Sequence, residues 1–221
     1  KVSADTVGLR NVTLIHGDFR EVPARLGPFD YIICHGVFAW VARETQPAII
    51  QFIRDHLAIN GVAFVSYNAY PGQHMVDMVR KLLNMHTAHA PNLDTKFAQS
   101  LAVMRFLKDS SENIKSDWRT TFLELELKHM EESGVDFLEH DYCTVESSPL
   151  YFSDFVKMCT KSGLAYLADS SPWNMYLDNH SPAVVENLRP LGDLVLQGQY
   201  LDFVQHSRYR ETLICRADST L

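Results

Sequence analysis

Three short apolar segments near the start of the chain have the length and composition of buried β-strands. They are rich in Val, Ile and Phe, and they cover residues 12–19, 29–38 and 61–68. Between the second and the third, apolar residues at helical spacing predict an amphipathic helix that begins after Thr45 and ends at Asn60-Gly61. The order strand, helix, strand predicts parallel strands joined by a crossover helix. Open sheets of this kind bind ligands beyond the carboxyl ends of their strands.

The rest of the chain combines helical patterns with two short strand patterns. Residues 1–10 predict the tail of a helix that ends near Gly8. The later predicted elements are a helical block from Met75 to about Glu139, a helix at 151–162 that ends at Gly163, a strand at 164–168, a helical block at 182–206 and a strand at 211–216. We therefore expect an α/β fold with five strands, three parallel and two late ones, and with helical insertions over the sheet.

Composition and charge exclude several classes of function. The chain has 20 Lys and Arg against 27 Asp and Glu, and no basic block, so we expect no nucleic-acid partner. No segment approaches the roughly 20 apolar residues of a membrane span, so we expect no membrane partner. The four cysteines are dispersed without a CxxC pair, which argues against a zinc site or a disulfide framework and favours a reducing, cytoplasmic location. A first residue of Lys1 rather than Met is typical of a fragment.

The common catalytic motifs are absent from the sequence. There is no GxSxG elbow and no P-loop, which argues against a standard hydrolase or NTPase. His86 and His89 have a helical spacing that would suit a metal, but no third ligand is indicated, so a solvated or packed helix face explains them better. We expect no metal site and identify no catalytic residue.

Several motifs together carry a family resemblance that covers nearly the whole chain. They are His16-Gly17-Asp18-Phe19, His35-Gly36-Val37-Phe38-Ala39-Trp40-Val41, Tyr67-Asn68 with Tyr70-Pro71-Gly72, His140-Asp141-Tyr142, Pro149-Leu150-Tyr151-Phe152 and Arg208 to Cys215. With them the chain resembles the class I S-adenosylmethionine-dependent methyltransferases. More narrowly, it is similar to the bacterial group with a methyltransferase regulatory domain, to which the rickettsial protein-lysine methyltransferases belong.

The resemblance implies a partial Rossmann-like sheet, strands three to seven of a seven-stranded fold, with helical cap insertions. It divides the chain into the C-terminal part of the cofactor-binding core (1–74), a helical cap insertion (75–148) and the closing helix and strands with a second helical insertion (149–221). The glycine loop after the first strand and the ribose-binding acid of the second have no counterpart here. We therefore expect poor cofactor binding unless upstream residues supply that half of the site.

The resemblance also assigns cofactor-binding roles at the strand ends. Asp18 and Phe19 would contact the adenine of S-adenosylmethionine, although Asp is also a common first residue of a turn. His35, Gly36 and Val37 would line the methionine end, where glycine lets the backbone approach closely. His35 is equally well explained as a hydrogen-bonded structural residue.

The acceptor side of the site is assigned in the same way. Phe38 and Trp40 suit cation–π contact with a sulfonium or an acceptor lysine, and such rings also suit a hydrophobic core. Tyr67, Asn68 and Tyr70 stand where an acceptor would be held, although Tyr70-Pro71-Gly72 also has the composition of a turn. His74, close to the same turn, is a weaker candidate.

The best function is therefore S-adenosylmethionine-dependent methyl transfer, with a protein lysine as the acceptor that the rickettsial enzymes suggest. The expected partners are a protein substrate and a second copy of the chain in a homodimer. The alternative is a non-catalytic regulatory or protein-binding module derived from a methyltransferase.

Overall fold

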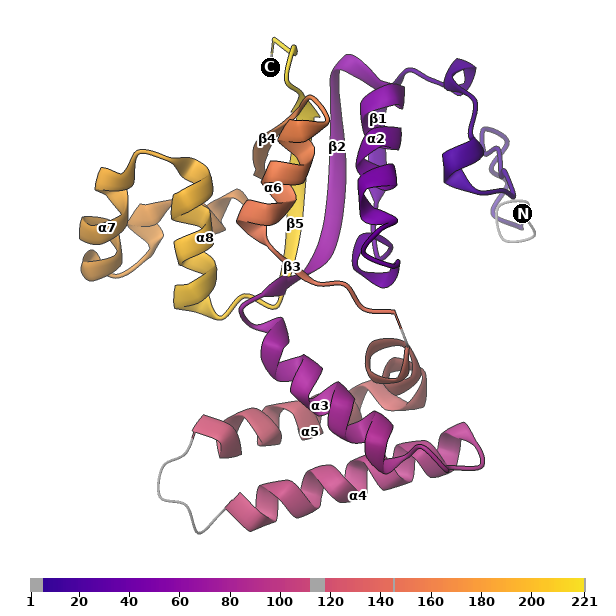
Figure 1. Ribbon diagram of the computed structural model, residues 1–221, viewed down its shortest axis with the longest axis vertical. Coiled ribbons are helices and arrows are strands. Elements are labelled where there is room, and N and C mark those ends of the chain that lie inside the picture. Colours follow the sequence, from indigo (N-terminus) through magenta and orange to yellow (C-terminus); the bar gives the residue numbers. More distant parts are fainter. Residues whose placement is uncertain (1–5, 112–117, 145, 221) are drawn as a thin grey trace. The chain divides into compact units, whose positions relative to one another are not determined.

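The computed structural model describes residues 6–111, 118–144 and 146–220, with Ala24 and Ser111 described in their backbone only. The main elements, labelled in Figure 1, are β1 (Phe29–Cys34), α2 (Gln46–His56), β2 (Leu57–Tyr70), α3 (Gln73–His86), α4 (Leu93–Ser111), α5 (Trp118–Phe137), β3 (Leu150–Tyr151), α6 (Phe152–Lys161), β4 (Leu164–Asp169), α7 (Pro182–Leu188), α8 (Leu194–Gln205) and β5 (Tyr209–Arg216). The α/β class and most of the predicted elements are confirmed.

The sheet has the strand order β1-β2-β5-β4, and the short β3 pairs with β2. Strands β1 and β2 are parallel and joined by α2, as the sequence predicts, whereas β4 and β5 pair antiparallel and close the sheet. The register shifts between Phe29, which pairs with Leu57, and Tyr31, which pairs with Val62. At this bulge a Cβ on Gly61 would lie 2.9 Å from the carbonyl oxygen of Phe29, so only glycine fits there.

The role expected of Gly61 is therefore wrong in one respect. The helix ends four residues before Asn60-Gly61, at His56, and β2 already begins at Leu57. Gly61 lies inside the strand, where it allows the close approach of β1, and it does not stop the helix.

Residues 12–18 do not form the predicted strand. The structure assigns them no regular element, and Asp18 then begins a short 3₁₀ turn at Phe19–Glu21. Val12, Leu14 and Ile15 are all exposed. The physical reason is that a strand needs a neighbour for its backbone N–H and C=O groups, and the described part of the chain offers none at this position. Local β propensity alone does not form a strand.

Burial of β1 on both faces, which its continuous apolar sequence suggests, is also wrong. Tyr31 and Ile33 point to one face of the strand and are 77% and 74% exposed, while Ile32 and Cys34 on the other face are half-buried. Within the described residues only β2 pairs with β1, so β1 is an edge strand with one uncovered face.

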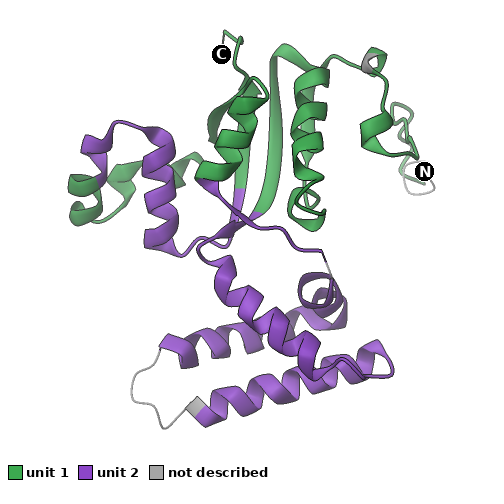
Figure 2. Ribbon diagram, viewed as in Figure 1, with its two compact units in different colours: residues 1–67, 153–187, 211–221 green, residues 68–152, 188–210 purple. Residues whose placement is uncertain are grey.

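The chain forms two compact units (Figure 2). The first contains residues 1–67, 153–187 and 211–221, and the second contains residues 68–152 and 188–210. The three-part division expected from the sequence stays a prediction. In the first unit, Phe155 of α6 stacks on Tyr67 of β2 at 4.5 Å between ring centroids and meets Phe38 edge-on. Ile50 and Ile53 of α2 are also fully buried in that unit.

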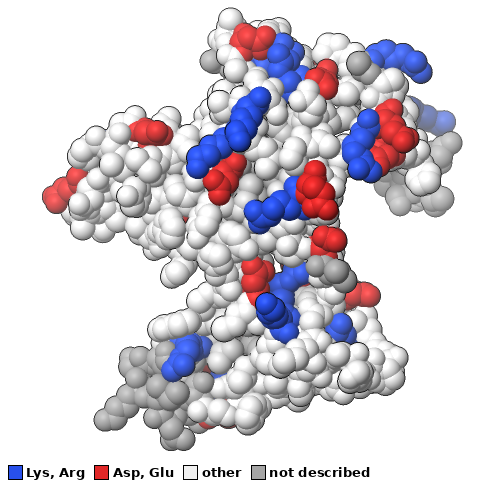
Figure 3. All heavy atoms as spheres, in the orientation of Figure 1, with Lys and Arg blue, Asp and Glu red and all other residues white. Residues whose placement is uncertain are grey.

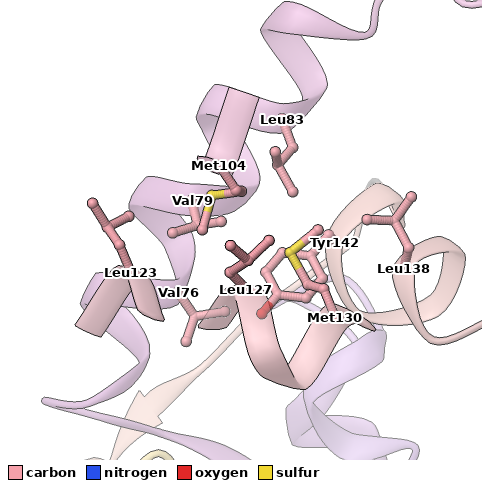
Figure 4. Close-up of a cluster of buried hydrophobic side chains, with 9 residues drawn as sticks. All are labelled: Val76, Val79, Leu83, Met104, Leu123, Leu127, Met130, Leu138 and Tyr142. Carbon is pink, nitrogen blue, oxygen red and sulfur yellow. The ribbon is translucent and has the colours of Figure 1, made fainter. Parts of the chain in front are cut away.

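The second unit is built mainly from helices. Helices α4 and α5 pack along each other, and α3 packs against α4 (Figure 1). Figure 4 shows the core between them, where side chains from all three helices meet Leu138 and Tyr142: Val76, Val79, Leu83, Met104, Leu123, Leu127 and Met130. Part of the apolar pattern of this region therefore serves the hydrophobic core, whereas Met78, Met85 and Leu125 are exposed.

On the face drawn in Figure 3, Lys and Arg side chains are interspersed with Asp and Glu. None of the helices in the described ranges has the length and apolarity needed to cross a membrane.

Candidate functional site

The loop that follows β1 is tied to β2 by one hydroxyl group. Gly36 adopts a left-handed conformation with φ +65°, which glycine reaches without strain. Its backbone N–H donates to Oγ of Ser66 at 3.0 Å, and the same Oγ lies 3.1 Å from Nδ1 of His35. Ser66 is buried in β2, so it holds His35 and Gly36 at the carboxyl end of the parallel pair.

The Ser66 hydroxyl also influences the chemistry of His35. Because a lone pair of Oγ accepts from Gly36, its single proton can be donated to Nδ1, which leaves the proton of the neutral imidazole on Nε2. His35 is exposed, and so are Gly36 and Val37. Apart from the two neighbours of Gly36 in the chain, no heavy atom of the described residues lies within 4 Å of the position that a Cβ on Gly36 would take. The loop therefore presents backbone and an imidazole to open space.

Ser66 is a site residue that the sequence analysis missed. The available signal was a single hydroxyl residue within the apolar run of β2, between Val65 and Tyr67. Nothing in the sequence shows that its partners are thirty residues away, in the loop after β1.

Asp18 and Phe19 lie on a different segment, the 3₁₀ turn beside α2. The Asp18 carboxylate caps this turn, accepts from the backbone N–H of Arg20 at 2.9 Å and also pairs with the Arg20 side chain. The hydrogen bond from the Arg20 side chain is the main cause that lowers the pKa of Asp18 to about 2. Phe19 meets Phe52 edge-on at 6.3 Å. Both side chains thus have structural partners, and their adenine-binding role stays a prediction.

The predicted acceptor residues separate into buried and accessible ones. Phe38 and Tyr67 are buried, their rings are 6.1 Å apart, and the Tyr67 hydroxyl lies 3.2 Å from Oγ1 of Thr212. They form part of the core of the first unit. Trp40 is half-buried, as are Asn68 and Tyr70. Substrate binding by these five residues stays a prediction, and the accessible three are its better candidates.

In the second unit, Tyr70 belongs to a polar aromatic cluster. Its ring stacks on His74 at 3.9 Å, and its hydroxyl donates to Asp77 at 3.0 Å. His74 Nε2 lies 3.0 Å from the hydroxyl of Tyr151, to which the sequence analysis assigns no site role. Tyr70, His74 and Asp77 follow one another at spacings of four and three residues, as residues on one face of a helix do. This spacing was the signal in the sequence that could have grouped them. The contact with Tyr151 spans 77 residues and depends on the pairing of β3 with β2.

No three His, Cys, Asp or Glu side chains in the described ranges are grouped as a metal site would require. Three cysteines, Cys34, Cys159 and Cys215, have a pKa that burial raises above its usual value. Burial raises the pKa of Cys34 to about 11 and that of Cys159 to about 12, which makes both thiols poor nucleophiles near neutral pH.

Comparison with protein families gives a match over residues 134–216, to the family described as a predicted methyltransferase regulatory domain. An uncharacterized protein of Rickettsia prowazekii (strain Madrid E) is 36% identical over 96% of this chain, and the aligned part is 38% of that protein. An uncharacterized protein of Synechocystis is 23% identical over 99% of this chain and 43% of its own length.

Solved structures also match nearly the whole of this chain. PKMT2 from Rickettsia typhi matches 97% of this chain and 40% of its own chain, with a TM-score of 0.84 and 31% identity. The structure of PKMT2 in complex with AdoHcy matches with a TM-score of 0.88 and 30% identity. This chain therefore spans about two fifths of the length of the Rickettsia prowazekii protein and of PKMT2.

Proposed function

Because this chain belongs to the class I methyltransferases that carry a methyltransferase regulatory domain, we propose that it is part of an S-adenosylmethionine-dependent methyltransferase. The observation that carries the proposal is the match over 97% of the chain, at 30% identity and a TM-score of 0.88, to PKMT2 in complex with AdoHcy. The activity is proposed for the longer protein, because the matched relatives extend well beyond this region.

The loop after β1 fits one end of the cofactor. It lies at the carboxyl end of a parallel strand pair, and the left-handed Gly36 faces open space that a side chain would fill. In the proposal, His35, Gly36 and Val37 line the methionine moiety, with Ser66 as the positioning residue that fixes the loop. Asp18 accepts from the adenine amino group, and Phe19 lies beside the ring.

When bound, S-adenosylmethionine supplies a methyl group on a sulfonium, which a nucleophile displaces in line. The protein therefore mainly orients the acceptor and excludes water. Trp40, Asn68 and Tyr70 are the residues we assign to acceptor orientation, through ring faces that attract a cation and an amide oxygen that accepts a hydrogen bond. The proposed acceptor is the amine of a protein lysine. It must be neutral to attack the methyl group.

Calorimetric titration with S-adenosylhomocysteine tests cofactor binding. We expect the chain extended by the residues encoded upstream to bind at least about 100-fold more tightly than this chain alone, because the extension supplies further contacts to the ligand. Absence of binding by the extended protein would contradict the methyltransferase proposal. Micromolar binding by this chain alone would instead show that the site is complete within it.

Methyl transfer itself separates the enzyme from a regulatory module, which the family match over residues 134–216 makes the second candidate. The extended protein is incubated with S-adenosylmethionine and either polylysine or acetylated polylysine, and the products are analysed by mass spectrometry. The proposal predicts mass increases of one methyl group on polylysine only. An extended protein that binds S-adenosylhomocysteine but methylates neither polymer would favour the non-catalytic module.

A further inference from the structure

The second unit contains a pocket with a volume of about 490 Å³, which lies in the range of small-molecule sites. Its walls come from the start of α3, the first half of α5 and the segment that links α8 to β5. Met75, Trp118, Phe122 and Leu125 provide the apolar surface, and Glu126, His206 and Arg208 are its charged or titratable residues. All of them belong to the same compact unit.

Helix α5 explains the apolar side of this pocket. Leu123, Leu127 and Met130 lie on the face that enters the core shown in Figure 4. Trp118, Phe122 and Leu125 recur at spacings of four and three residues on another face, and Trp118 and Leu125 are more than 60% exposed. Phe122 also packs against that core, but the core does not account for the exposed Trp118 and Leu125. Exposed apolar surface grouped around a pocket is typical of a binding site.

An ion pair between the buried Glu126 and the partly exposed Arg208 forms the polar end of the pocket. The side chain of Glu126 is only 2% exposed, and its carboxylate accepts from the Tyr142 hydroxyl and from Nη1 of Arg208. Arg208 Nη2 donates a further bond to Oε2 at 3.3 Å. Both carboxylate oxygens are thus used by donors within the protein. Burial, with the Glu126 charge as the next cause, raises the pKa of Tyr142 and keeps its hydroxyl a donor.

Arg208 is the charged group that a ligand in the pocket meets. Its side chain is 43% exposed, in contrast to that of Glu126. A guanidinium has five N–H donors, and the bonds to Glu126 use one on each terminal nitrogen. The pocket therefore offers hydrogen-bond donors and a positive charge at the end of an apolar cavity, which is complementary to an anion.

From this arrangement we propose that the pocket binds a small amphipathic carboxylate, with its apolar part between Trp118, Phe122 and Leu125 and its carboxylate on Arg208. His206 and Arg208 lie within residues 134–216, the part matched by the regulatory-domain family. A ligand here acts as an effector of that region, and its binding does not depend on methyl transfer.

Three probes with eight carbon atoms each and different head groups test the inference: octanoate, 1-octanol and octylammonium. Each is titrated calorimetrically into the full 221-residue chain. We expect octanoate to bind at least about tenfold more tightly than octanol, because a charge-assisted hydrogen bond to Arg208 is added, and octylammonium to bind most weakly. Equal affinities, tightest binding of octylammonium or no binding of octanoate would overturn the proposal.

Two variants connect the binding to this pocket. Leu125→Gln places an amide on the apolar wall and should weaken octanoate binding about tenfold, whereas Phe106→Gln, at an equally exposed position on α4, should leave it unchanged. Arg208→Met alone would leave the Glu126 charge buried and unpaired, so the double variant Glu126→Gln with Arg208→Met is used. It should still bind octanol but lose the preference for octanoate. Retention of that preference by the double variant would exclude Arg208 as the recognition group.

Discussion

Ser66 connects the two strands of the candidate site through a single oxygen atom. Its hydroxyl is bonded to the backbone of Gly36 and lies against the imidazole of His35, and its side chain is buried. A buried hydroxyl group stabilises the fold only when it is hydrogen-bonded. The hydrogen bonds of Ser66 therefore make a contribution to stability that an apolar residue does not make.

Replacement of Ser66 by alanine tests how much its hydroxyl group contributes to stability. Ser66→Ala should lower the free energy of unfolding by about 1 kcal/mol, the usual net contribution of a hydrogen bond, as measured by urea denaturation. Ser100→Ala is the matched control, because the hydroxyl of Ser100 is also buried but has no hydrogen-bond partner among the described residues. We expect no loss, or a small gain, for Ser100→Ala. Equal losses for the two variants would contradict the role of Ser66.

The reactivity of the Cys34 thiol and its dependence on pH give a second prediction for a single residue. Burial raises its pKa from 9.0 to about 11. At pH 8 the reactive thiolate is thus about 100-fold rarer than in an ordinary cysteine, and alkylation by iodoacetamide should be slower by a similar factor. The rate should increase tenfold per pH unit until the pH nears the raised pKa. Because this pKa is raised on folding, its contribution to stability is full below pH 9 and is lost as the pH rises through 11.

The control for this measurement is Cys34 in the urea-unfolded chain, followed by mass spectrometry of the same peptide. If Cys34 reacted equally fast in the folded and the unfolded chain at pH 8, the thiol would not be buried as described.

Among the elements, the turn between β2 and α3 is fixed by close contact of backbones. The N–H of Gly72 donates to the carbonyl of Ser207 at 3.0 Å, and a Cβ on Gly72 would lie 2.2 Å from the carbonyl oxygen of His206. Both contacts join the turn to the segment between α8 and β5, within the second unit. The predicted turn at Tyr70-Pro71-Gly72 is thus explained by the space available at its glycine.

Gly72→Ala should therefore be strongly destabilising. Backbone atoms must move to accommodate the new methyl group, and we expect the free energy of unfolding to fall by about 3 kcal/mol. Gly17→Ala serves as the control, because no atom lies within 4 Å of the Cβ position there, and it should change stability by less than about 0.5 kcal/mol. Thermal and urea unfolding measure both variants, and a Gly72→Ala protein as stable as the control would refute the contact.

For the molecule as a whole, the uncovered face of β1 is the main unexplained surface of the sheet. Tyr31 and Ile33 are apolar, adjacent on one face and largely exposed. The matched relatives are more than twice as long as this region. We expect residues outside this region to cover Tyr31 and Ile33 in the longer protein, because an apolar edge strand otherwise promotes association.

The double variant Tyr31→Ser with Ile33→Ser tests this at the level of stability. In this chain it should change the free energy of unfolding by less than about 0.5 kcal/mol, since exposed side chains contribute little. In the extended protein it should cost more than about 3 kcal/mol, because two large side chains would be removed from a core. Ile50→Ser, buried in this chain, should be costly in both proteins. Equal small effects of the double variant in both proteins would mean that the face stays exposed.

Local patterns predicted those elements whose stability depends on near neighbours. The helix that begins at Gln46 and the strand that begins at Phe29 were correctly predicted from apolar spacing, although both end earlier than predicted. Gly163 follows α6 with the φ of +74° expected of a glycine after a helix. Residues 12–18 have a similar strand composition and were wrongly predicted, because a strand exists only when another strand pairs with it.

The candidate sites likewise contain residues that local sequence signals identify and residues that they do not. The positions of His35 and Gly36 at a strand end could be identified from the sequence, since glycine after a strand is a local signal. Ser66 and Tyr151 could not, because their hydrogen bonds join residues far apart in the chain. The ion pair between Glu126 and Arg208 spans 82 residues, and two isolated charges in a sequence do not indicate that one is buried against the other.

The sequence by itself thus determined the α/β class, the order of most helices and strands, and the family to which the chain belongs, because periodicity, turn residues and motifs are local properties. Only the tertiary structure decided which predicted strand found a partner, which aromatic side chains entered the core and where the charged pocket formed. These depend on contacts between distant residues, and their free energy is gained only when the chain brings both partners together.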